Sequence, residues 1–342
     1  MKKSLHISVL GGGSFGTTLC NLIAENGFYA NLWVRNEERA FEINNHHVNS
    51  NYLPDLKLDH RVTASTDLIS CVSKADILFI AVPSQSFENV LSNISDYVPE
   101  SAYIISLTKG IDHNNFKLMS QLINEYFPIN EVGVLSGPNL AKELSQKQLT
   151  ATVIASTSPI LIKRIQEVLY SPFFRVYSSE DIFGVELGGA LKNIYAIVSG
   201  LASALDVGMN THAMIMTRSL AEMSRFAVSM GANPLTFLGL SGVGDLIVTC
   251  SSSLSRNYQV GYSIGKGKNI DEATIELGQV AEGVNTLKLV VNKARELDVY
   301  MPLAFGLHSL IYENQTIDNI IKQLMSGDQS TDVEFTIKSD NS

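Results

Sequence analysis

The sequence has few cysteines and a deficit of positive charge. Its three cysteines are scattered and form no CxxC pair, which argues against a disulfide framework and suits the reduced thiols of a cytoplasmic protein. Lysine and arginine number 25 against 34 aspartates and glutamates, so the formal net charge is −9. This balance argues against nucleic acid or an anionic membrane as a partner.

Motifs of metal and nucleophile chemistry are missing too. The seven histidines show neither HxH nor HExxH spacing, and no GxSxG segment occurs, so we expect no metal site and no serine nucleophile. The apolar run after Met1 meets Gly11 too soon for a signal peptide. The stretch Leu187–Leu205 approaches transmembrane length. It contains Lys192 and Asn193, so we expect a buried helix of a soluble protein and no integral membrane span.

Strand-like apolar runs alternate with helical segments in the first half of the chain. With 342 residues, of which 45% are hydrophobic, the chain has room for two domains and a sizeable core. Alternation of strands and helices implies a parallel sheet with helices on both faces. The expected strands are Leu5–Leu10, Tyr29–Val34, Ile77–Val82, Tyr103–Leu107, Val132–Leu135, Thr152–Ala155 and Phe174–Tyr177.

Beyond residue 178 the pattern becomes helical. Apolar residues from Leu187 to Leu205 recur at spacings of three and four, which describes one continuous helix face. The sequence therefore predicts an α/β fold in which a Rossmann-type doubly wound sheet precedes an all-helical domain. The predicted domains are a dinucleotide-binding domain over 1–180, a helical substrate-binding domain over 181–327 and a frayed polar tail over 328–342.

A glycine-rich loop, Gly11-x-Gly13-x-x-Gly16, lies between the first strand and the first helix. Glycines in that place allow a tight turn, close approach of a pyrophosphate to the backbone, and close packing of helix on sheet. The loop alone is weak evidence, but its position within a βαβ unit favours dinucleotide binding. It is not a Walker loop, because no GK[ST] follows.

The end of the second strand bears on the choice between NADP and NAD. A cation there binds the 2′-phosphate of NADP, whereas a carboxylate binds the ribose 2′-hydroxyl of NAD. Arg35 follows the strand and favours NADP(H), while Glu37, two residues on, leaves NAD(H) open.

Several polar residues occupy positions that suit an active site. Lys109 follows a predicted parallel strand, at the edge where such sheets bind ligands. Lys192 lies in an apolar helix, where a buried ammonium needs an anion, a route to solvent or a role in proton transfer. Asp245 stands in a glycine-rich turn, and the segment Ser255-Arg256-Asn257 begins a predicted helix and resembles a phosphate site. Each residue alone also has an ordinary structural explanation, as a surface lysine, a turn aspartate or a helix cap.

Taken in order, these segments resemble bacterial NAD(P)-dependent glycerol-3-phosphate dehydrogenase. The resemblance extends from about Ile7 to about Pro302. It is carried by Gly11–Gly16, Asn49–Pro54, Thr108–Gly110, Ser136–Pro138, Gly188–Asn193, Gly242–Leu246, Ser255–Asn257 and Val280–Gly283. It implies NADPH-dependent, reversible reduction of dihydroxyacetone phosphate to sn-glycerol 3-phosphate, which supplies glycerophospholipid synthesis.

The resemblance also implies roles for individual residues. Lys192 would be the general acid/base, Lys109 would polarise the carbonyl, and Asp245 would orient Lys192. The implied substrate-binding residues are Lys109, Gly137, Asn139, Lys192, Asp245, Ser255, Arg256 and Asn257. The implied cofactor-binding residues are Gly11, Gly13, Ser14, Phe15, Gly16, Arg35, Lys109, Ala141, Arg256, Val280 and Glu282.

Two other functions remain open on the sequence. A related β-hydroxyacid or ketopantoate-type reductase would share the glycine loop and a helical second domain with a lysine, but would not need Asp245 or the Ser255–Asn257 segment. A non-catalytic dinucleotide-sensing module would need neither Lys109 nor Lys192. The resemblance further implies a homodimer.

The neighbours of Lys192 at helical spacing include two glycines, Gly188 and Gly189. These small residues are expected to leave room beside Lys192 for a ligand.

Overall fold

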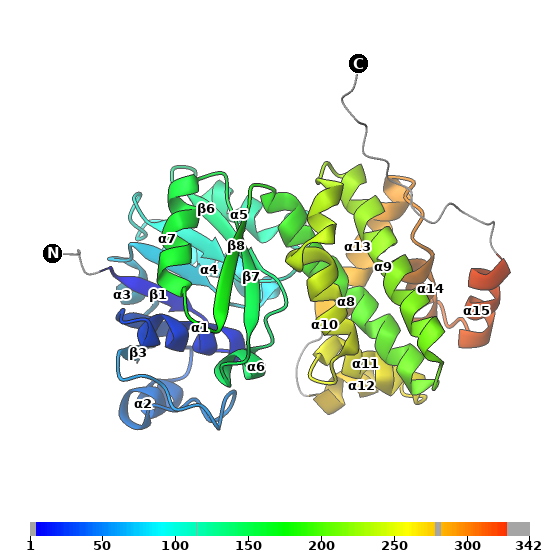
Figure 1. Cartoon of the computed structure of the whole chain (residues 1–342), viewed down its shortest axis with the longest axis horizontal. Helices are drawn as coiled ribbons and strands as arrows, with labels where there is room; N and C mark the ends of the chain where they lie inside the picture. Colours follow the sequence, from blue (N-terminus) through cyan, green and yellow to red (C-terminus); the bar gives the residue numbers. More distant parts are fainter. Residues whose placement is uncertain (1–4, 114, 278–281, 327–342) are drawn as a thin grey trace, which may run out of the picture. The chain divides into compact units, whose positions relative to one another are not determined.

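The computed structural model describes residues 5–113, 115–277 and 282–326. The chain forms two compact units, Met1–Glu186 and Leu187–Ser342 (Figure 1). The division falls inside helix α8 (Ile182–Ala204), somewhat beyond residue 180, where the sequence analysis placed it. The polar tail predicted over 328–342 lies outside the described residues.

The first unit is built on an eight-stranded sheet with the order β3-β2-β1-β4-β5-β6-β7-β8 among the described residues. Together with the helical second unit, it confirms the predicted fold class. Strand β3 was not predicted; it has four residues of alternating burial and lies at the edge of the sheet. The strands are β1 Ile7–Leu10, β2 Ala30–Trp33, β3 Val62–Ser65, β4 Ile77–Ile80, β5 Tyr103–Ser106, β6 Val132–Ser136, β7 Thr150–Ala155 and β8 Phe174–Ser179.

Two strands, β7 and β8, run opposite to the others and depart from the parallel sheet that was predicted. Strand β7 pairs antiparallel to β6, and β8 is parallel to β7. The connection from β6 to β7 contains the short helix α6 (Ala141–Ser145), which packs beside α1. Because α6 does not cross back over the sheet as a βαβ helix does, β7 starts at the carboxyl end of β6 and runs in the opposite direction.

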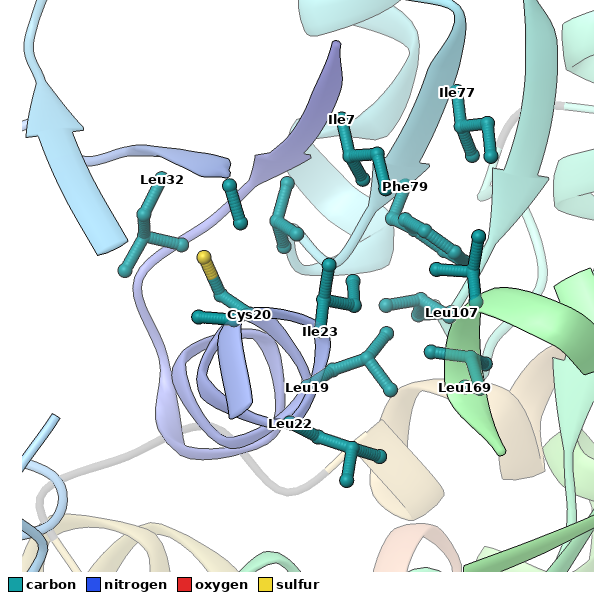
Figure 2. Close-up of a cluster of buried hydrophobic side chains, with 14 of the residues drawn as sticks. Ile7, Leu19, Cys20, Leu22, Ile23, Leu32, Ile77, Phe79, Leu107 and Leu169 are labelled. Atoms are coloured by element: carbon teal, nitrogen blue, oxygen red, sulfur yellow. The ribbon is translucent and has the colours of Figure 1, made fainter. Parts of the chain in front are cut away.

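Side chains of the buried strands alternate between two cores. Ile7 and Val9 point to the face covered by α1 (Ser14–Glu25) and α7 (Pro159–Leu169), in the core drawn in Figure 2. Leu10 points to the opposite core, which is covered by α3 (Leu68–Val72), α4 (Ser84–Ile94) and α5 (Met119–Tyr126). This two-residue period, with apolar residues on both faces, is typical of a doubly covered sheet.

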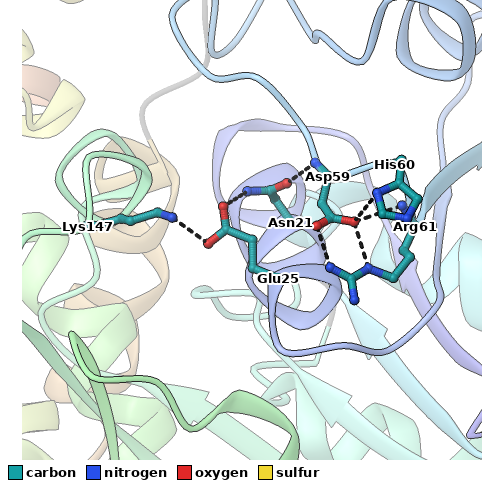
Figure 3. Close-up of polar contacts among 6 residues, drawn as sticks. All are labelled: Asn21, Glu25, Asp59, His60, Arg61 and Lys147. Carbon is teal, nitrogen blue, oxygen red and sulfur yellow. Dashed lines mark hydrogen bonds and ion pairs between the residues drawn. The ribbon is translucent and has the colours of Figure 1, made fainter.

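A polar network holds α1 against the segments that flank it (Figure 3). The amide of Asn21 accepts a hydrogen bond from the Asp59 backbone N–H and donates to Glu25. Glu25 also pairs with Lys147, at 3.0 Å. The Arg61 guanidinium donates two hydrogen bonds to the Asp59 carboxylate and the Arg61 backbone N–H donates a third, and these lower the pKa of Asp59 to about 2. The turn before β3 and the segment after α6 are thereby both tied to α1.

The secondary-structure elements of the second unit are all helices within its described residues. Its longest helix, α8, meets the length and hydropathy of a membrane span, but 83% of its most apolar window is buried inside the protein, as in a core helix. After α8, the helices are α9 Met209–Ser229, the 3₁₀ turn η1 Pro234–Leu238, the π turn η2 Leu240–Gly244, α10 Asp245–Ser251, α11 Arg256–Gly265, α12 Ile270–Leu277, α13 Glu282–Glu296, α14 Pro302–Tyr312 and α15 Ile317–Ser326.

Two buried glutamates each cap the start of a helix. Glu222 of α9 accepts hydrogen bonds from the backbone N–H groups of Leu303 and Ala304 at the start of α14, and from the hydroxyl of Tyr195. Glu186 accepts from the backbone and hydroxyl of Ser120 in the first turn of α5. Burial is the largest influence on both carboxyls, and it raises the pKa of each to about 7.

The two glutamates make stability depend on pH. A folded-state pKa of about 7, above the ordinary 4.5, means that the folded chain binds extra protons between these values. The stabilisation is complete below the lower value and is lost as the pH rises through the higher one. We expect the free energy of unfolding to fall by about 1–3 kcal/mol per glutamate between about pH 5 and about pH 8 in urea titrations.

The amide of Glu222→Gln does not titrate, so this variant should lose its share of the pH dependence. Glu186→Gln is the matched variant and should behave in the same way. A Glu222→Gln protein that retains the full wild-type slope would contradict the assignment.

Candidate active site

The three motif glycines of the loop between β1 and α1 have different surroundings. Gly11 has a φ of +117°, and a Cβ there would lie 2.6 Å from the carbonyl oxygen of Ala81. A Cβ on Gly16 would lie 2.1 Å from the carbonyl oxygen of Gly11. A Cβ on Gly13, in contrast, would have no neighbour within 4 Å. Gly11 and Gly16 therefore serve the turn and the packing of helix on strand, while Gly13 leaves open space beside the backbone for a ligand.

The first turn of α1 lies directly after Gly13, next to the open space beside the loop backbone. Ser14 and Phe15 are the first two residues of the helix, and its N-cap residue, Gly13, makes no side-chain cap hydrogen bond. The hydroxyl of Thr18 donates to the backbone carbonyls of Ser14, at 2.9 Å, and of Ala141, at 3.4 Å. Three predicted cofactor residues, Ser14, Phe15 and Ala141, thus lie around one helix N-terminus, which favours a bound phosphate.

The segment after β2 carries both the predicted cation and the competing carboxylate. Arg35 is exposed just beyond the strand, and Glu37 is the exposed first residue of α2 (Glu37–His46). The side chain of Asn36 caps α2 by accepting a hydrogen bond from the backbone N–H of Arg39. The Oδ1 of Asn36 is therefore used in the helix cap, and the two charged candidates for the cofactor ribose are Arg35 and Glu37.

A second group of predicted residues gathers at the ends of β5 and β6. The ammonium of Lys109 donates to the backbone carbonyl of Gly137, at 3.0 Å. Gly137 has a φ of +146°, and a Cβ there would lie 3.2 Å from the Cα of Thr152. The amide nitrogen of Asn139 donates to the hydroxyl of Thr152, at 2.8 Å, while its Oδ1 is buried and unpaired within the described structure. The three predicted substrate residues of the first unit therefore lie side by side.

Lys192 in the second unit is buried, with 6% of its surface exposed, and Asp245 is fully buried. Lys192 forms an ion pair with the carboxylate of Asp245 and donates a hydrogen bond to the hydroxyl of Thr249, at 2.7 Å. The Thr249 hydroxyl donates in turn to the backbone carbonyl of Asp245, at 2.6 Å. The ammonium is thus held by two oxygens, and the explanation that Lys192 merely reaches solvent is wrong.

Thr249, a hydrogen-bond partner of Lys192, was not predicted from the sequence. It lies four residues after Asp245 in the helix α10, so both side chains fall on one helical face. Asp245 was predicted to stand in a glycine-rich turn, but the π turn η2 runs directly into α10, and Asp245 is the first residue of α10. Had that helix been recognised, its i,i+4 spacing would have indicated Thr249.

The space expected beside Gly188 is filled. A Cβ on Gly188 would lie 2.9 Å from the carbonyl oxygen of Ser241 and 3.5 Å from the ring of Phe237. This glycine therefore lets the turn η2 approach α8 and does not leave room for a ligand. Its close contact with Ser241 places the segment that leads to Asp245 against the helix that carries Lys192.

The predicted phosphate segment forms the first turn of α11. Ser255 is the N-cap and its hydroxyl accepts from the backbone N–H of Tyr258, while Arg256 is exposed. Asn257 is buried, and its Oδ1 accepts from the backbone N–H of Gly283, at 3.0 Å. This hydrogen bond fixes the orientation of the Asn257 amide, whose nitrogen points away from Gly283 and can donate to another group.

The predicted cofactor residues of α13 are only partly described. Glu282 is the first residue of α13 and adjoins the Asn257–Gly283 contact. Val280 lies outside the described residues.

Comparisons with known proteins cover both units. The model for the NAD-dependent glycerol-3-phosphate dehydrogenase N-terminus matches residues 6–161, and that for the C-terminus of the same enzymes matches residues 181–322. A protein of Alcanivorax borkumensis named glycerol-3-phosphate dehydrogenase (NAD(P)+) is 53% identical over 332 residues, or 97% of each chain. The crystal structure of glycerol-3-phosphate dehydrogenase from Coxiella burnetii has a TM-score of 0.90 at 32% identity, and the match covers 95% of this chain and 100% of that chain.

A reductase of the rival class shares the fold only. The crystal structure of 2-dehydropantoate 2-reductase from Methylococcus capsulatus has a TM-score of 0.57 at 14% identity, and the match covers 94% of this chain and 98% of that chain. Such a likeness shows a common architecture and carries no argument about substrate.

The contrast between Gly13 and Gly16 yields a test of the loop. Alanine fits the backbone of Gly13, whose φ is −76°, and its methyl group would occupy the open space where the pyrophosphate is expected. We expect Gly13→Ala to raise the Kd for NADPH, measured by fluorescence titration, about tenfold or more, a loss of about 1.4 kcal/mol. The urea midpoint should match that of the wild type.

Gly16→Ala is the matched control. Its methyl group would clash with the carbonyl of Gly11, so we expect it to cost about 1–3 kcal/mol of stability. Unchanged NADPH affinity in a folded Gly13→Ala protein would show that the open side of the loop is not where the dinucleotide binds.

Proposed function

Because the chain belongs to the NAD-dependent glycerol-3-phosphate dehydrogenase family, we propose that Lys192, Asp245 and Thr249 form the proton-transfer centre of this reaction. The protein is an NAD(P)-dependent oxidoreductase that acts on a CH–OH group, and its reaction is the reversible reduction of dihydroxyacetone phosphate to sn-glycerol 3-phosphate. The resemblance predicted from the sequence is confirmed by these comparisons.

The observation that supports this centre best is the buried ion pair between Lys192 and Asp245. Removing two charges from water is costly, and a buried pair is weak evidence for stability alone. Charges retained in such a place are candidates for function. In the direction of reduction, the Lys192 ammonium gives its proton to the C2 oxygen of the substrate as negative charge develops there. Asp245 and Thr249 hold the nitrogen in place before and after the transfer.

The dinucleotide supplies the hydride when it is bound. We propose that Gly11, Gly13 and Gly16 fit its pyrophosphate, since the loop leaves open space at Gly13 and no side-chain cap at the start of α1. Arg35 would favour the 2′-phosphate of NADP(H) over NAD(H), through a charge-assisted contact. The remaining proposed cofactor residues are Ser14, Phe15, Lys109, Ala141, Arg256, Val280 and Glu282.

We propose that two groups of residues bind the substrate. Lys109, Gly137 and Asn139 would bind near the reacting carbonyl, where the Lys109 ammonium polarises it. Ser255, Arg256 and Asn257 would bind the phosphate, since a guanidinium and backbone N–H groups of a helix start suit a dianion. Phosphate binding of this kind supplies remote binding energy that positions the C2 carbon.

The cellular setting is also a proposal. The product would supply glycerophospholipid synthesis in the cytoplasm, where the buried free thiols of Cys20, Cys71 and Cys250 remain reduced. We propose a homodimer, which light scattering of the purified protein would test.

Substrate and cofactor preference can be measured together. We expect purified protein to oxidise NADPH with dihydroxyacetone phosphate, and to use NADH less well. Arg35→Ala should narrow this preference by raising the KM for NADPH, because a charge-assisted hydrogen bond of about 1.5–3 kcal/mol is lost. Turnover of ketopantoate or a 3-hydroxyacid in place of the phosphorylated ketone would favour the related reductases.

Lys192 can be tested separately for chemistry and for stability. We expect Lys192→Met to lower turnover by about 100- to 10,000-fold, the usual contribution of a general acid, while NADPH still binds. The variant should also lose about 3–5 kcal/mol of stability, because the buried carboxylate of Asp245 loses Lys192 as its ion-pair partner.

The double variant Lys192→Met/Asp245→Asn is the control. It removes both charges, so it should regain most of the lost stability in urea titrations and remain inactive. Near-wild-type turnover of Lys192→Met would exclude Lys192 as the proton donor.

A further inference from the structure

One buried side chain in the segment that follows α2 forms hydrogen bonds with the glycine loop and with α1. Asn49 is fully buried, and its Nδ2 donates to the backbone carbonyl of Gly12, at 3.0 Å, and to the hydroxyl of Thr17, at 2.8 Å. Both partners flank Gly13, the residue with open space beside its backbone. Asn49 therefore contacts the loop at the point where the dinucleotide is expected.

The position of Asn49 is itself fixed by backbone hydrogen bonds. Its carbonyl accepts from the backbone N–H groups of Tyr52, at 3.1 Å, and Leu53, at 2.9 Å, and an isolated β-bridge joins Asn49 to Leu53. The turn makes the side chain a rigid support for the loop.

The amide orientation follows from chemistry. If the amide were rotated, its oxygen would face the carbonyl oxygen of Gly12, and two acceptors would oppose each other. In the observed orientation the Oδ1 of Asn49 is buried without a partner in the described structure. A buried acceptor without a hydrogen bond lowers the stability of the fold. If this position served packing alone, an apolar side chain would avoid that loss, so the amide is better explained by the hydrogen bonds that its nitrogen donates.

The bond to Gly12 determines where the next N–H points. A trans peptide directs its C=O and N–H to opposite sides, and none of the described peptide bonds is cis. Holding the Gly12 carbonyl toward Asn49 therefore turns the Gly13 N–H away from Asn49. The hydrogen bond from Asn49 to the Thr17 hydroxyl also fixes the first turn of α1 relative to the loop. Thr17 belongs to that turn, and its backbone N–H donates to the Gly13 carbonyl, at 2.9 Å.

We propose that Asn49 is a positioning residue for the dinucleotide, which holds the Gly12–Gly13 peptide so that the Gly13 N–H faces the pyrophosphate. The proposal rests on the function proposed above and goes beyond it, because Asn49 would act through the loop without touching the cofactor. It predicts that the residue matters for binding of the pyrophosphate and little for the adenosine end or for the chemical step.

The test is the variant Asn49→Asp, which has the same size but cannot donate to the Gly12 carbonyl. We expect the Kd and the KM for NADPH to rise about tenfold or more. Turnover at saturating NADPH, and the KM for dihydroxyacetone phosphate, should stay within about twofold of wild type.

A second ligand separates positioning from general damage. Adenosine 2′-monophosphate lacks the pyrophosphate, so its affinity, measured by competition with NADPH, should be unchanged in Asn49→Asp. The matched control is Asn44→Asp. The Asn44 amide makes its two hydrogen bonds to the backbone of Ala64 in β3, whereas that of Asn49 makes its hydrogen bonds to Gly12 and Thr17. The Asn44→Asp variant should therefore have a lower urea midpoint than the wild type and an unchanged Kd for NADPH.

Two further variants keep the proposal testable if Asn49→Asp does not fold. Asn49→Ala removes the donor without adding charge and should raise the Kd for NADPH about 3- to 10-fold. Thr17→Val removes one of the two acceptors and leaves the Gly12 bond in place, so its effect should be smaller.

Several outcomes would overturn the proposal. One is an unchanged Kd for NADPH in a folded Asn49 variant, and another is an equal loss of affinity for NADPH and adenosine 2′-monophosphate. A Kd for Thr17→Val that rises more than that of Asn49→Ala would assign the effect to Thr17. Failure of the wild-type protein to bind NADPH would instead contradict the proposed function.

Discussion

The ion pair between Lys192 and Asp245 places the strictest demand on the geometry of the second unit. Its two charged groups are almost completely removed from water, and such a pair is tolerated only where the geometry is good and further hydrogen bonds are made. Thr249 supplies one of those bonds. The helices around α8 must therefore bring Asp245 to Lys192 accurately, and errors of position would cost far more here than between apolar side chains.

Glycines make that accuracy possible, because they let helix backbones approach α8 directly. A Cβ on Gly261 of α11 would lie 1.9 Å from the carbonyl oxygen of Ile197, and one on Gly283 of α13 would lie 2.6 Å from that of Asn193. Gly188 does the same for the segment before Asp245. Any larger residue would push these helices away from α8. The glycines of this unit thus set distances, whereas those of the first unit set a turn and expose a ligand site.

The sequence predicted features that depend on neighbouring residues. The glycine loop, the core strands and the helix of Lys192 follow from local spacing and apolar runs, and the structure has them. Strand β3 was missed because it is short and lies at the sheet edge, and the direction of β7 was wrong because it depends on where α6 packs. The contacts of Thr249 and Asn49 were not predicted, because the helix that carries Thr249 was not recognised and because the partners Lys192 and Gly12 lie far away in the chain.

A chain with a net negative charge can bind a dianion if groups of positive potential lie close to the binding site. The formal net charge is −9, but exposed charges farther away than a Debye length, about 8–10 Å, are largely screened. Helix starts act at shorter range, since their backbone N–H groups point at the ligand. The hydrogen bond from Gly283 to Asn257 holds the starts of α11 and α13 together. If Arg256 joins them at the phosphate, as we propose, three sources of positive potential converge while the rest of the surface stays acidic. Binding then depends on how the helices begin, and the total charge of the chain has little influence on it.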